Sequence, residues 1–306
     1  MEILAAATGV LIAIQARSNG QLAKEIHNPI EAALVSFSSG LIAVVVIALF
    51  NSNIRRGLST LRRAVKLHEL PLWPLFAGAI GGVVIAIQTS VVSAIGVAIY
   101  SVASISGQTA VSLFIDRIGL VNGVKQHISP RRVLAAITTI LAVFLSVGDK
   151  VSVTHFALLA VVMTVIAGSL IGIQRALNGK INHHSKQSFA TSLLNFITGT
   201  SALVVTLVAM IIIRGDHLYA LPKGPWWLYL GGITGVIYIA FASTVVQHLG
   251  VLTFTLFSVG GQLLGSLLID IFLPSQGSHV TWFLVSGIVL TYVGVLIGGQ
   301  SRLFRR

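Results

Sequence analysis

Two stretches of 46 residues without a charged side chain, 70–115 and 224–269, constrain this chain more than any other feature. The hydrocarbon core of a bilayer is about 30 Å thick, and about 20 apolar residues in a helix cross it. One helix of 46 residues would reach about 69 Å. Each stretch must therefore hold two crossings joined by a tight turn, and we expect these turns near 93–96 and 247–250.

Charged residues are scarce in the whole chain. Only 9% of the 306 residues are Asp, Glu, Lys or Arg, against about 25% in soluble domains, and the mean hydropathy is +0.93. This composition excludes a soluble enzyme and a disordered chain. Because there is no cysteine, it also excludes a disulfide scaffold and a thiolate site. We predict an all-α integral membrane protein with ten transmembrane helices, at 3–22, 29–50, 72–93, 96–116, 132–149, 153–176, 188–213, 226–247, 250–272 and 281–299.

The basic residues predict the orientation of these spans. With the N-terminus inside, the loops 51–70, 117–132 and 177–187, the tail 302–306 and Arg175 hold 15 of the 20 Lys and Arg residues. Basic loops face the cytoplasm, so both termini are expected there. The net charge of +12 therefore reports topology, and no nucleic-acid partner is expected. Residues 3–16 follow Glu2 and lack a basic leader, so we expect the first span of the mature protein and not a signal peptide.

The chain repeats itself. Gln15 and Asn19 recur as Gln174 and Asn178, at a shift of 159 residues. The longest match aligns 107–116 (Gly-Gln-Thr-Ala-Val-Ser-Leu-Phe-Ile-Asp) with 261–270 (Gly-Gln-Leu-Leu-Gly-Ser-Leu-Leu-Ile-Asp), at a shift of 154. We predict two five-helix repeats, 1–150 and 151–306. An odd number of spans per repeat makes their topologies inverted, as in many secondary transporters.

These motifs resemble a known family. Ten helices in two inverted halves, Gln-x-x-x-Asn-Gly in spans one and six, and Gly-Gln-x-x-x-Ser-Leu-x-Ile-Asp in spans four and nine are similar to the YdcZ-like branch of the drug/metabolite transporter superfamily. The resemblance covers nearly the whole chain. It implies a bacterial inner-membrane transporter of small molecules without naming a substrate.

Polar side chains at membrane depth are costly, so each one is a candidate functional residue. The amides of a repeat lie one helical turn apart on one face and offer both donors and acceptors. The candidates for substrate binding are Gln15, Asn19, Gln174, Asn178, Gln108 and Gln262. The same residues are equally compatible with hydrogen bonds that only hold helices together. Gln88 is a weaker candidate, because its counterpart Ala242 is not polar.

Asp116 and Asp270 lie eight residues after Gln108 and Gln262, on the same helical face but near the membrane surface. We consider a gating or coupling role, in which each aspartate closes one side in turn. The alternative is a carboxylate at a helix end that pairs with a neighbour. The related small multidrug resistance proteins carry a membrane-embedded glutamate in the first helix. This chain has Gln15 there, which puts proton-coupled cation antiport in doubt.

We therefore predict a secondary transporter of small polar organic solutes or metabolites, in a lipid bilayer and with alternating access; export is favoured, and a homodimer is left open. The alternatives are a proton-coupled multidrug or cation exporter, a passive channel, and an integral-membrane enzyme acting on lipid-linked substrates. The enzyme is disfavoured, because no acid–base cluster lies at membrane depth. No cofactor or metal is expected, since there is no Walker A or H-E-x-x-H motif and the pair His183-His184 has no carboxylate nearby.

Overall fold

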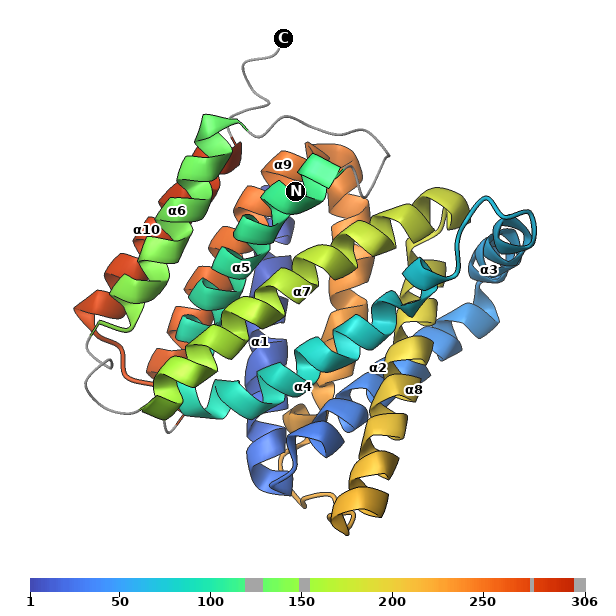
Figure 1. The fold of residues 1–306 in the computed structure, drawn as a ribbon, viewed down its shortest axis with the longest axis horizontal. Coiled ribbons are helices and arrows are strands. Elements are labelled where there is room, and N and C mark those ends of the chain that lie inside the picture. The colour runs from blue at the N-terminus through green and yellow to red at the C-terminus, as the bar shows by residue number, and fades with distance from the viewer. Residues whose placement is uncertain (119–128, 149–154, 276–277, 300–306) are drawn as a thin grey trace.

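A computed structural model describes residues 1–118, 129–148, 155–275 and 278–299, and in these residues it contains helices and no strand (Figure 1). The elements in chain order are α1 (Glu2–Ile26), α2 (Pro29–Phe50), α3 (Ser52–Lys66), η1 (Trp73–Phe76), α4 (Ala77–Ile95), α5 (Val97–Ile118), α6 (Pro130–Ser146), α7 (His155–Ser185), α8 (Ser188–Arg214), η2 (Trp226–Leu230), α9 (Gly231–Phe272) and α10 (Trp282–Gly299).

The turn predicted near 93–96 is confirmed. Helix α4 ends at Ile95, and α5 begins at Val97. The one residue between them, Gly96, has φ of 84°. This left-handed conformation strains residues with a side chain. A Cβ on Gly96 would also lie 2.8 Å from a carboxylate oxygen of Asp270, so only glycine fits this turn.

The turn predicted at 247–250 differs, because a single helix is assigned across it, from Gly231 to Phe272. The chain nevertheless reverses within this helix, as its order of contacts with α1 shows. Along α9, Gly231 lies against Asn19, Val245 packs in one cluster with Ala5, and Gly265 lies against Val10. The first half of α9 therefore runs antiparallel to α1 and the second half parallel to it, and the ribbon bends back on itself near its middle (Figure 1).

The segment 51–70, predicted as a loop, contains the helix α3. Asn51 begins this helix by accepting a hydrogen bond from the backbone N–H of Asn53, 3.0 Å away. The buried residues of α3 recur every three to four positions, which places them on one face; they are Ile54, Gly57, Leu61 and Ala64. Its basic residues point outward and are Arg55, Arg56, Arg62, Arg63 and Lys66. An amphipathic helix of this kind lies along a membrane surface.

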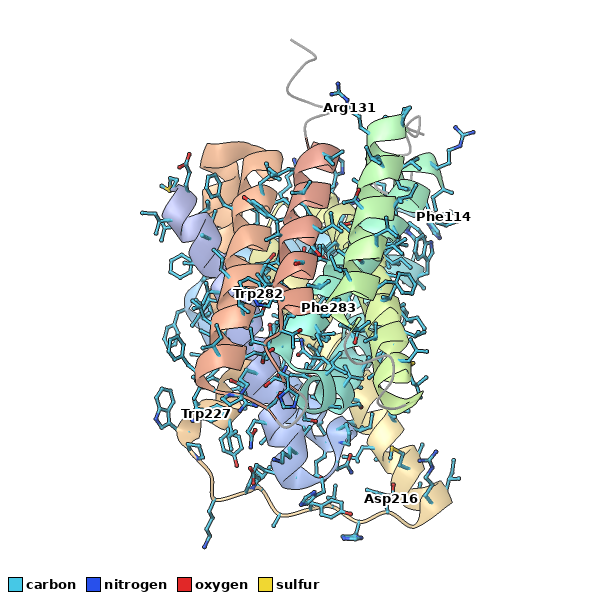
Figure 2. The ribbon with its side chains drawn as sticks, turned by 90° about the vertical axis from the view of Figure 1, so that its left-hand side faces the viewer. Phe114, Arg131, Asp216, Trp227, Trp282 and Phe283 are labelled. Atoms are coloured by element: carbon cyan, nitrogen blue, oxygen red, sulfur yellow. The ribbon has the colours of Figure 1, made fainter. Side chains whose placement is uncertain are left out.

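The outer surface of the bundle is apolar. Exposed hydrophobic side chains include Phe114 and Phe144, each 63% exposed, as expected where helices face lipid. Figure 2 shows Phe114 on the flank of the bundle, with Arg131 at one end and Asp216 at the other. Six helical segments in the described part of the chain are long and apolar enough to cross a membrane; they are Pro29–Phe50, Trp73–Ile95, Val97–Ile115, Leu158–Ser185, Ser188–Arg214 and Phe254–Phe272.

Close glycine contacts occur in matched pairs. We call two residues counterparts when they are 159 positions apart in α1–α2 and α7–α8, or 154 apart in α4–α5 and α9. A Cβ added to any of these glycines would collide with a facing residue, and each collision recurs between the counterparts. The contact pairs are Gly9–Ser258 with Gly168–Ser104, Gly261–Ala6 with Gly107–Val165, Gly232–Ser36 with Gly78–Asn195, and Gly40–Phe196 with Gly199–Phe37. Every one of these contacts joins one half of the chain to the other.

Candidate substrate cavity

A polar cavity of about 450 Å³ lies where the two halves meet. Seven helices contribute to its lining: α1, α2, α4, α5, α7, α8 and α9. It collects five of the six amides predicted to bind substrate, namely Gln15, Gln108, Gln174, Asn178 and Gln262. The sixth, Asn19, does not line it and is completely buried. A mostly apolar wall with a few convergent polar groups is the usual form of a small-molecule site.

Much of the lining consists of counterparts. Seven pairs contribute both members: Ile12 with Ile171, Gln15 with Gln174, Ser36 with Asn195, Phe37 with Phe196, Gly81 with Gly235, Val84 with Tyr238, and Gln108 with Gln262. The rings of Phe37 and Phe196 meet edge to face, with their centroids 5.5 Å apart. Since these two residues are counterparts, their contact lies midway between the halves. Equivalent positions of both halves thus surround one space.

Asn19 belongs to a hydrogen-bonded chain behind the cavity wall. Its amide Nδ2 donates to Oε1 of Gln88 over 2.8 Å, and Nε2 of Gln88 donates to the hydroxyl of Tyr100 over 3.1 Å. Tyr100 also bonds to Ser104, which accepts from Nε2 of Gln108 over 3.2 Å. Asn19 therefore positions Gln88 and Tyr100, and these two side chains contact the cavity.

The other half carries a different network. Nε2 of Gln174 donates to Oδ1 of Asn195 over 3.1 Å, and Nδ2 of Asn195 donates to Oδ1 of Asn178 over 2.7 Å. This arrangement leaves Oε1 of Gln174 and Nδ2 of Asn178 free for a ligand. Within the described residues, the half-buried amide of Gln15 has no hydrogen-bond partner, so both its donor and its acceptor are free. Gln262 is buried and donates a long bond of 3.5 Å to Ser101.

Asp270 lies at the contact between the end of α9 and the start of α5. It is 4% exposed and accepts hydrogen bonds from the backbone N–H groups of Val97, at 3.1 Å, and Ala98, at 2.8 Å. These N–H groups form the positive N-terminal end of α5, which favours a carboxylate. The charge of Arg17 also acts on Asp270. Asp270 thus joins the end of α9 to the start of α5. The side chain of Asp116, its counterpart, lies outside the described residues.

At the open end of the cavity, the lining residues of one half have no lining counterparts in the other half. Further lining residues come from the second half of α7 and the first turns of α8: Arg175, Asn178, Gly179, Asn182, Ser188, Thr191 and Ser192. None of their seven counterparts lines the cavity, and five of these, Ala16, Asn19, Ala23, Ala32 and Ala33, are at most 5% exposed. The cavity therefore extends toward the α7–α8 turn and is closed at the equivalent place near the α1–α2 turn.

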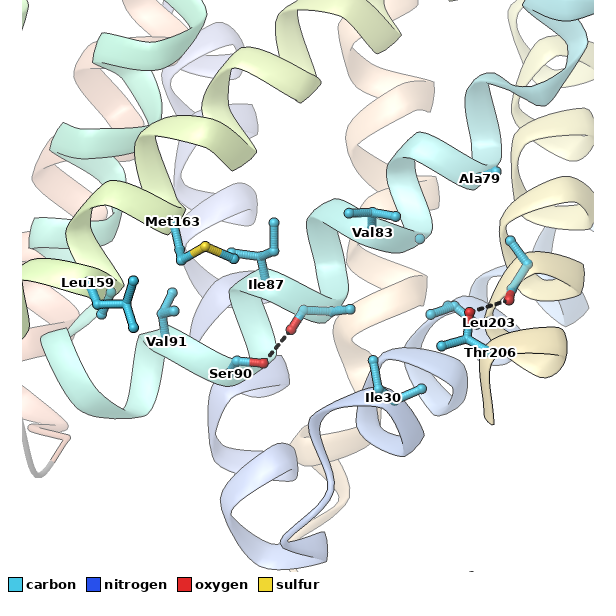
Figure 3. A pocket seen from close by; sticks show the side chains of 14 residues that line it. Ile30, Ala79, Val83, Ile87, Ser90, Val91, Leu159, Met163, Leu203 and Thr206 are labelled. Atoms are coloured by element: carbon cyan, nitrogen blue, oxygen red, sulfur yellow. Dashed lines mark hydrogen bonds between the residues drawn. The ribbon is translucent and has the colours of Figure 1, made fainter. Parts of the chain in front are cut away.

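A second hollow, of about 420 Å³, differs in chemistry (Figure 3). It lies between α4, α7 and α8, and its wall is almost entirely aliphatic. Its two hydroxyl groups are already bonded within their own helices, from Ser90 to the carbonyl of Ala86 and from Thr206 to that of Ala202. An acyl chain suits such a groove better than a polar solute does.

Several cavity residues escaped the sequence analysis. Arg175 was counted only as a topology marker at a helix end, but α7 continues to Ser185 and brings Arg175 into the lining. Asn195, Tyr100 and the two phenylalanines were not candidates either. The recurrence of Phe37 and Gly40 as Phe196 and Gly199 was the available signal for the phenylalanines. Tyr100 had none, because its counterpart is Phe254.

The comparison with known proteins identifies the family of the chain. The family described as "Putative inner membrane exporter, YdcZ" matches residues 1–145 and 159–297, which is nearly the entire chain. No curated protein matches the chain. The matched segments contain every residue that lines the cavity. The chain belongs to the YdcZ family of inner-membrane exporters, which is a family of transporters and not of enzymes.

Proposed function

We propose that this protein is a secondary active transporter of small polar organic solutes, built as ten spans in two inverted five-helix repeats, 1–150 and 151–306. The observation that carries the proposal is the cavity, to which seven pairs of counterparts contribute both members. A substrate site at the interface of two inverted repeats is characteristic of secondary transporters. The matched glycine contacts between the halves support the same organisation.

The repeats also provide a mechanism for alternating access. In this structure the α7–α8 half of the cavity is open and the equivalent α1–α2 half is closed. Exchanging the two packings between the repeats would close the first opening and open the second. The open end adjoins the side that holds most of the basic residues, so under the positive-inside rule this structure is the inward-open state.

Asp270 serves as the closing contact on the other side. Its two hydrogen bonds to the start of α5, together with the small Gly96 turn, seal the region that must separate in the outward-open state. Charge-assisted hydrogen bonds of this type are stronger than neutral ones, yet their donors are backbone groups that water can satisfy after separation. We assign Asp116 the equivalent role on the cytoplasmic side, by the repeat alone.

The lining disfavours the alternative of a proton-coupled cation exporter. The described cavity residues include no Asp or Glu, and a cationic solute would have no counter-charge there. The energy source and the direction of transport do not follow from the cavity. Export is favoured because the family is one of exporters.

The test is solute uptake by purified protein in liposomes, with the double variant Gln15→Ala/Gln174→Ala. Because both amides border the cavity, we expect saturable uptake by the wild type and a loss of at least about tenfold in kcat/KM in the variant, about 1.4 kcal/mol. Asn53→Ala, at an exposed amide on α3, is the control and should transport normally. Unchanged transport by the double variant would refute the site. The absence of saturable transport of any solute by the wild type would refute the function.

A further inference from the structure

The cavity carries a positive charge that has no acidic partner in it. Arg175 is exposed and lines the cavity next to Gln174. It is the one Lys or Arg among the described lining residues, which include no Asp or Glu. No ion pair to Arg175 occurs within the described part of the chain. Because this side chain is exposed at the cavity and has no counter-charge among the described lining residues, its guanidinium is available to bind an anion.

The groups around Arg175 are arranged to donate hydrogen bonds. Asn178 follows it by three residues, so the two are neighbours on one side of α7. The Oδ1 of Asn178 already accepts from Asn195, so its Nδ2 remains as a donor. A guanidinium offers two parallel N–H groups that match the two oxygens of a carboxylate. Arg175 and Asn178 together thus form a donor set for an oxyanion at the open end of the cavity.

The halves differ at this point. The counterpart of Arg175 is Ala16, which is 1% exposed, whereas Arg17 lies one position further on and outside the lining. The repeat therefore does not require an arginine at 175 for packing. The rest of the lining is neutral and includes the rings of Phe37 and Phe196, which suit the carbon body of a solute.

We infer that the transported solute is a small organic anion whose carboxylate binds Arg175 and Asn178 while its body lies between the amides and the phenylalanine rings. This inference rests on the proposed transport function and narrows its substrate class. Because like charges repel, the same arginine disfavours amines.

The experiment offers proteoliposomes an equimolar mixture of small organic carboxylates, their uncharged amides and the corresponding amines, and measures the entry of each by mass spectrometry. The wild type should take up carboxylates saturably and in preference. Arg175→Gln should lower carboxylate uptake at least tenfold, and Arg175→Lys should retain part of it, because the charge remains without the planar fork. Arg62→Gln, which removes an exposed charge from α3, is the matched control and should behave as the wild type.

The outcomes separate this inference from the proposed function. Saturable uptake of amides or amines in preference to carboxylates would overturn the anion assignment and leave the transporter standing. Carboxylate uptake by Arg175→Gln at the wild-type rate would overturn the role of Arg175. If no compound of any charge enters saturably, both proposals fail. Equal elution profiles of the variants on gel filtration would show that the comparison concerns folded protein.

Discussion

At the scale of single residues, equivalent side chains have taken different roles. Asn19 and Asn178 are counterparts, yet Asn19 is completely buried and bonded to Gln88, whereas Asn178 lines the cavity with a free donor. Gln15 and Gln174 differ in the same way, since Gln174 is bonded to Asn195 and Gln15 has no partner in the described residues. Roles at this scale depend on which hydrogen bonds are already made.

This difference predicts a separation of stability from transport. Asn19→Ala should lower the free energy of unfolding by about 1–3 kcal/mol, because it leaves a buried acceptor on Gln88 without its donor. Gln15→Ala should leave stability within about 0.5 kcal/mol and raise KM, because its amide is free to bind solute. Thermal unfolding in detergent and uptake kinetics measure the two effects. A destabilised Gln15→Ala with normal kinetics would contradict the assignment.

Asp270 allows a second test at this scale. If it acts as a closing contact, Asp270→Asn should retain partial transport, because its single amide oxygen can still accept from one of the two N–H groups, that of Val97 or that of Ala98. Asp270→Ala should lose more, since both bonds disappear. If Asp270 instead carries a coupling proton, both variants should lose all dependence of uptake on a pH gradient. Uptake measured with and without that gradient distinguishes the two roles.

At the scale of elements, glycines determine how closely helices pack. A Cβ on Gly261 would overlap the backbone carbonyl of Ala6, whereas a Cβ on Gly235 would lie 3.4 Å from the end of the Gln15 side chain, an ordinary contact. Small residues allow such close approach between membrane helices. Packing energy between α1 and the second half of α9 therefore depends on Gly261.

The expected consequence is that Gly261→Ala destabilises the protein by about 1–3 kcal/mol through overpacking, whereas Gly235→Ala is nearly neutral. Gly107, the counterpart of Gly261, faces the carbonyl of Val165, so Gly107→Ala should lower the stability by a similar amount. Melting temperatures of the three variants in one detergent provide the comparison. An effect of Gly261→Ala without any effect of Gly107→Ala would argue against equivalent packing in the two halves.

The elements also show what the sequence could reveal. Missing charges and repeated motifs predicted the helical class, the Gly96 turn and most of the cavity amides, because the cost of polar groups in lipid acts on composition directly. The helix α3 could have been found from the three-to-four-residue spacing of Ile54, Gly57, Leu61 and Ala64. The place of Arg175 in the cavity lining could not have been found from the sequence, because counting charges places every arginine at an end of a membrane span.

At the scale of the whole molecule, the two halves differ around the cavity both in sequence and in exposure. A repeat predicts that Asn182 and Ala23 occupy equivalent positions, but it cannot tell which of them is open. In the structure Asn182 lines the cavity and Ala23 is 5% exposed. Alternating access requires that these two environments exchange during transport.

The natural absence of cysteine makes this exchange measurable. In Asn182→Cys, a thiol in the cavity should react with a polar maleimide added from the cytoplasmic side, whereas Ala23→Cys should be protected as long as the protein stays in this state. Removing the closing contact with Asp270→Ala favours the outward-open state, so it should increase labelling of Ala23→Cys from the outside and decrease that of Asn182→Cys. Ser59→Cys, exposed on α3, is the control that should react equally in all backgrounds. If Asp270→Ala increased the labelling of Asn182→Cys and of Ala23→Cys together, the fold would have loosened. That result would contradict an exchange between two packed states. A reciprocal change, in contrast, requires that one closure forms as the other separates, which is the defining property of an alternating-access transporter.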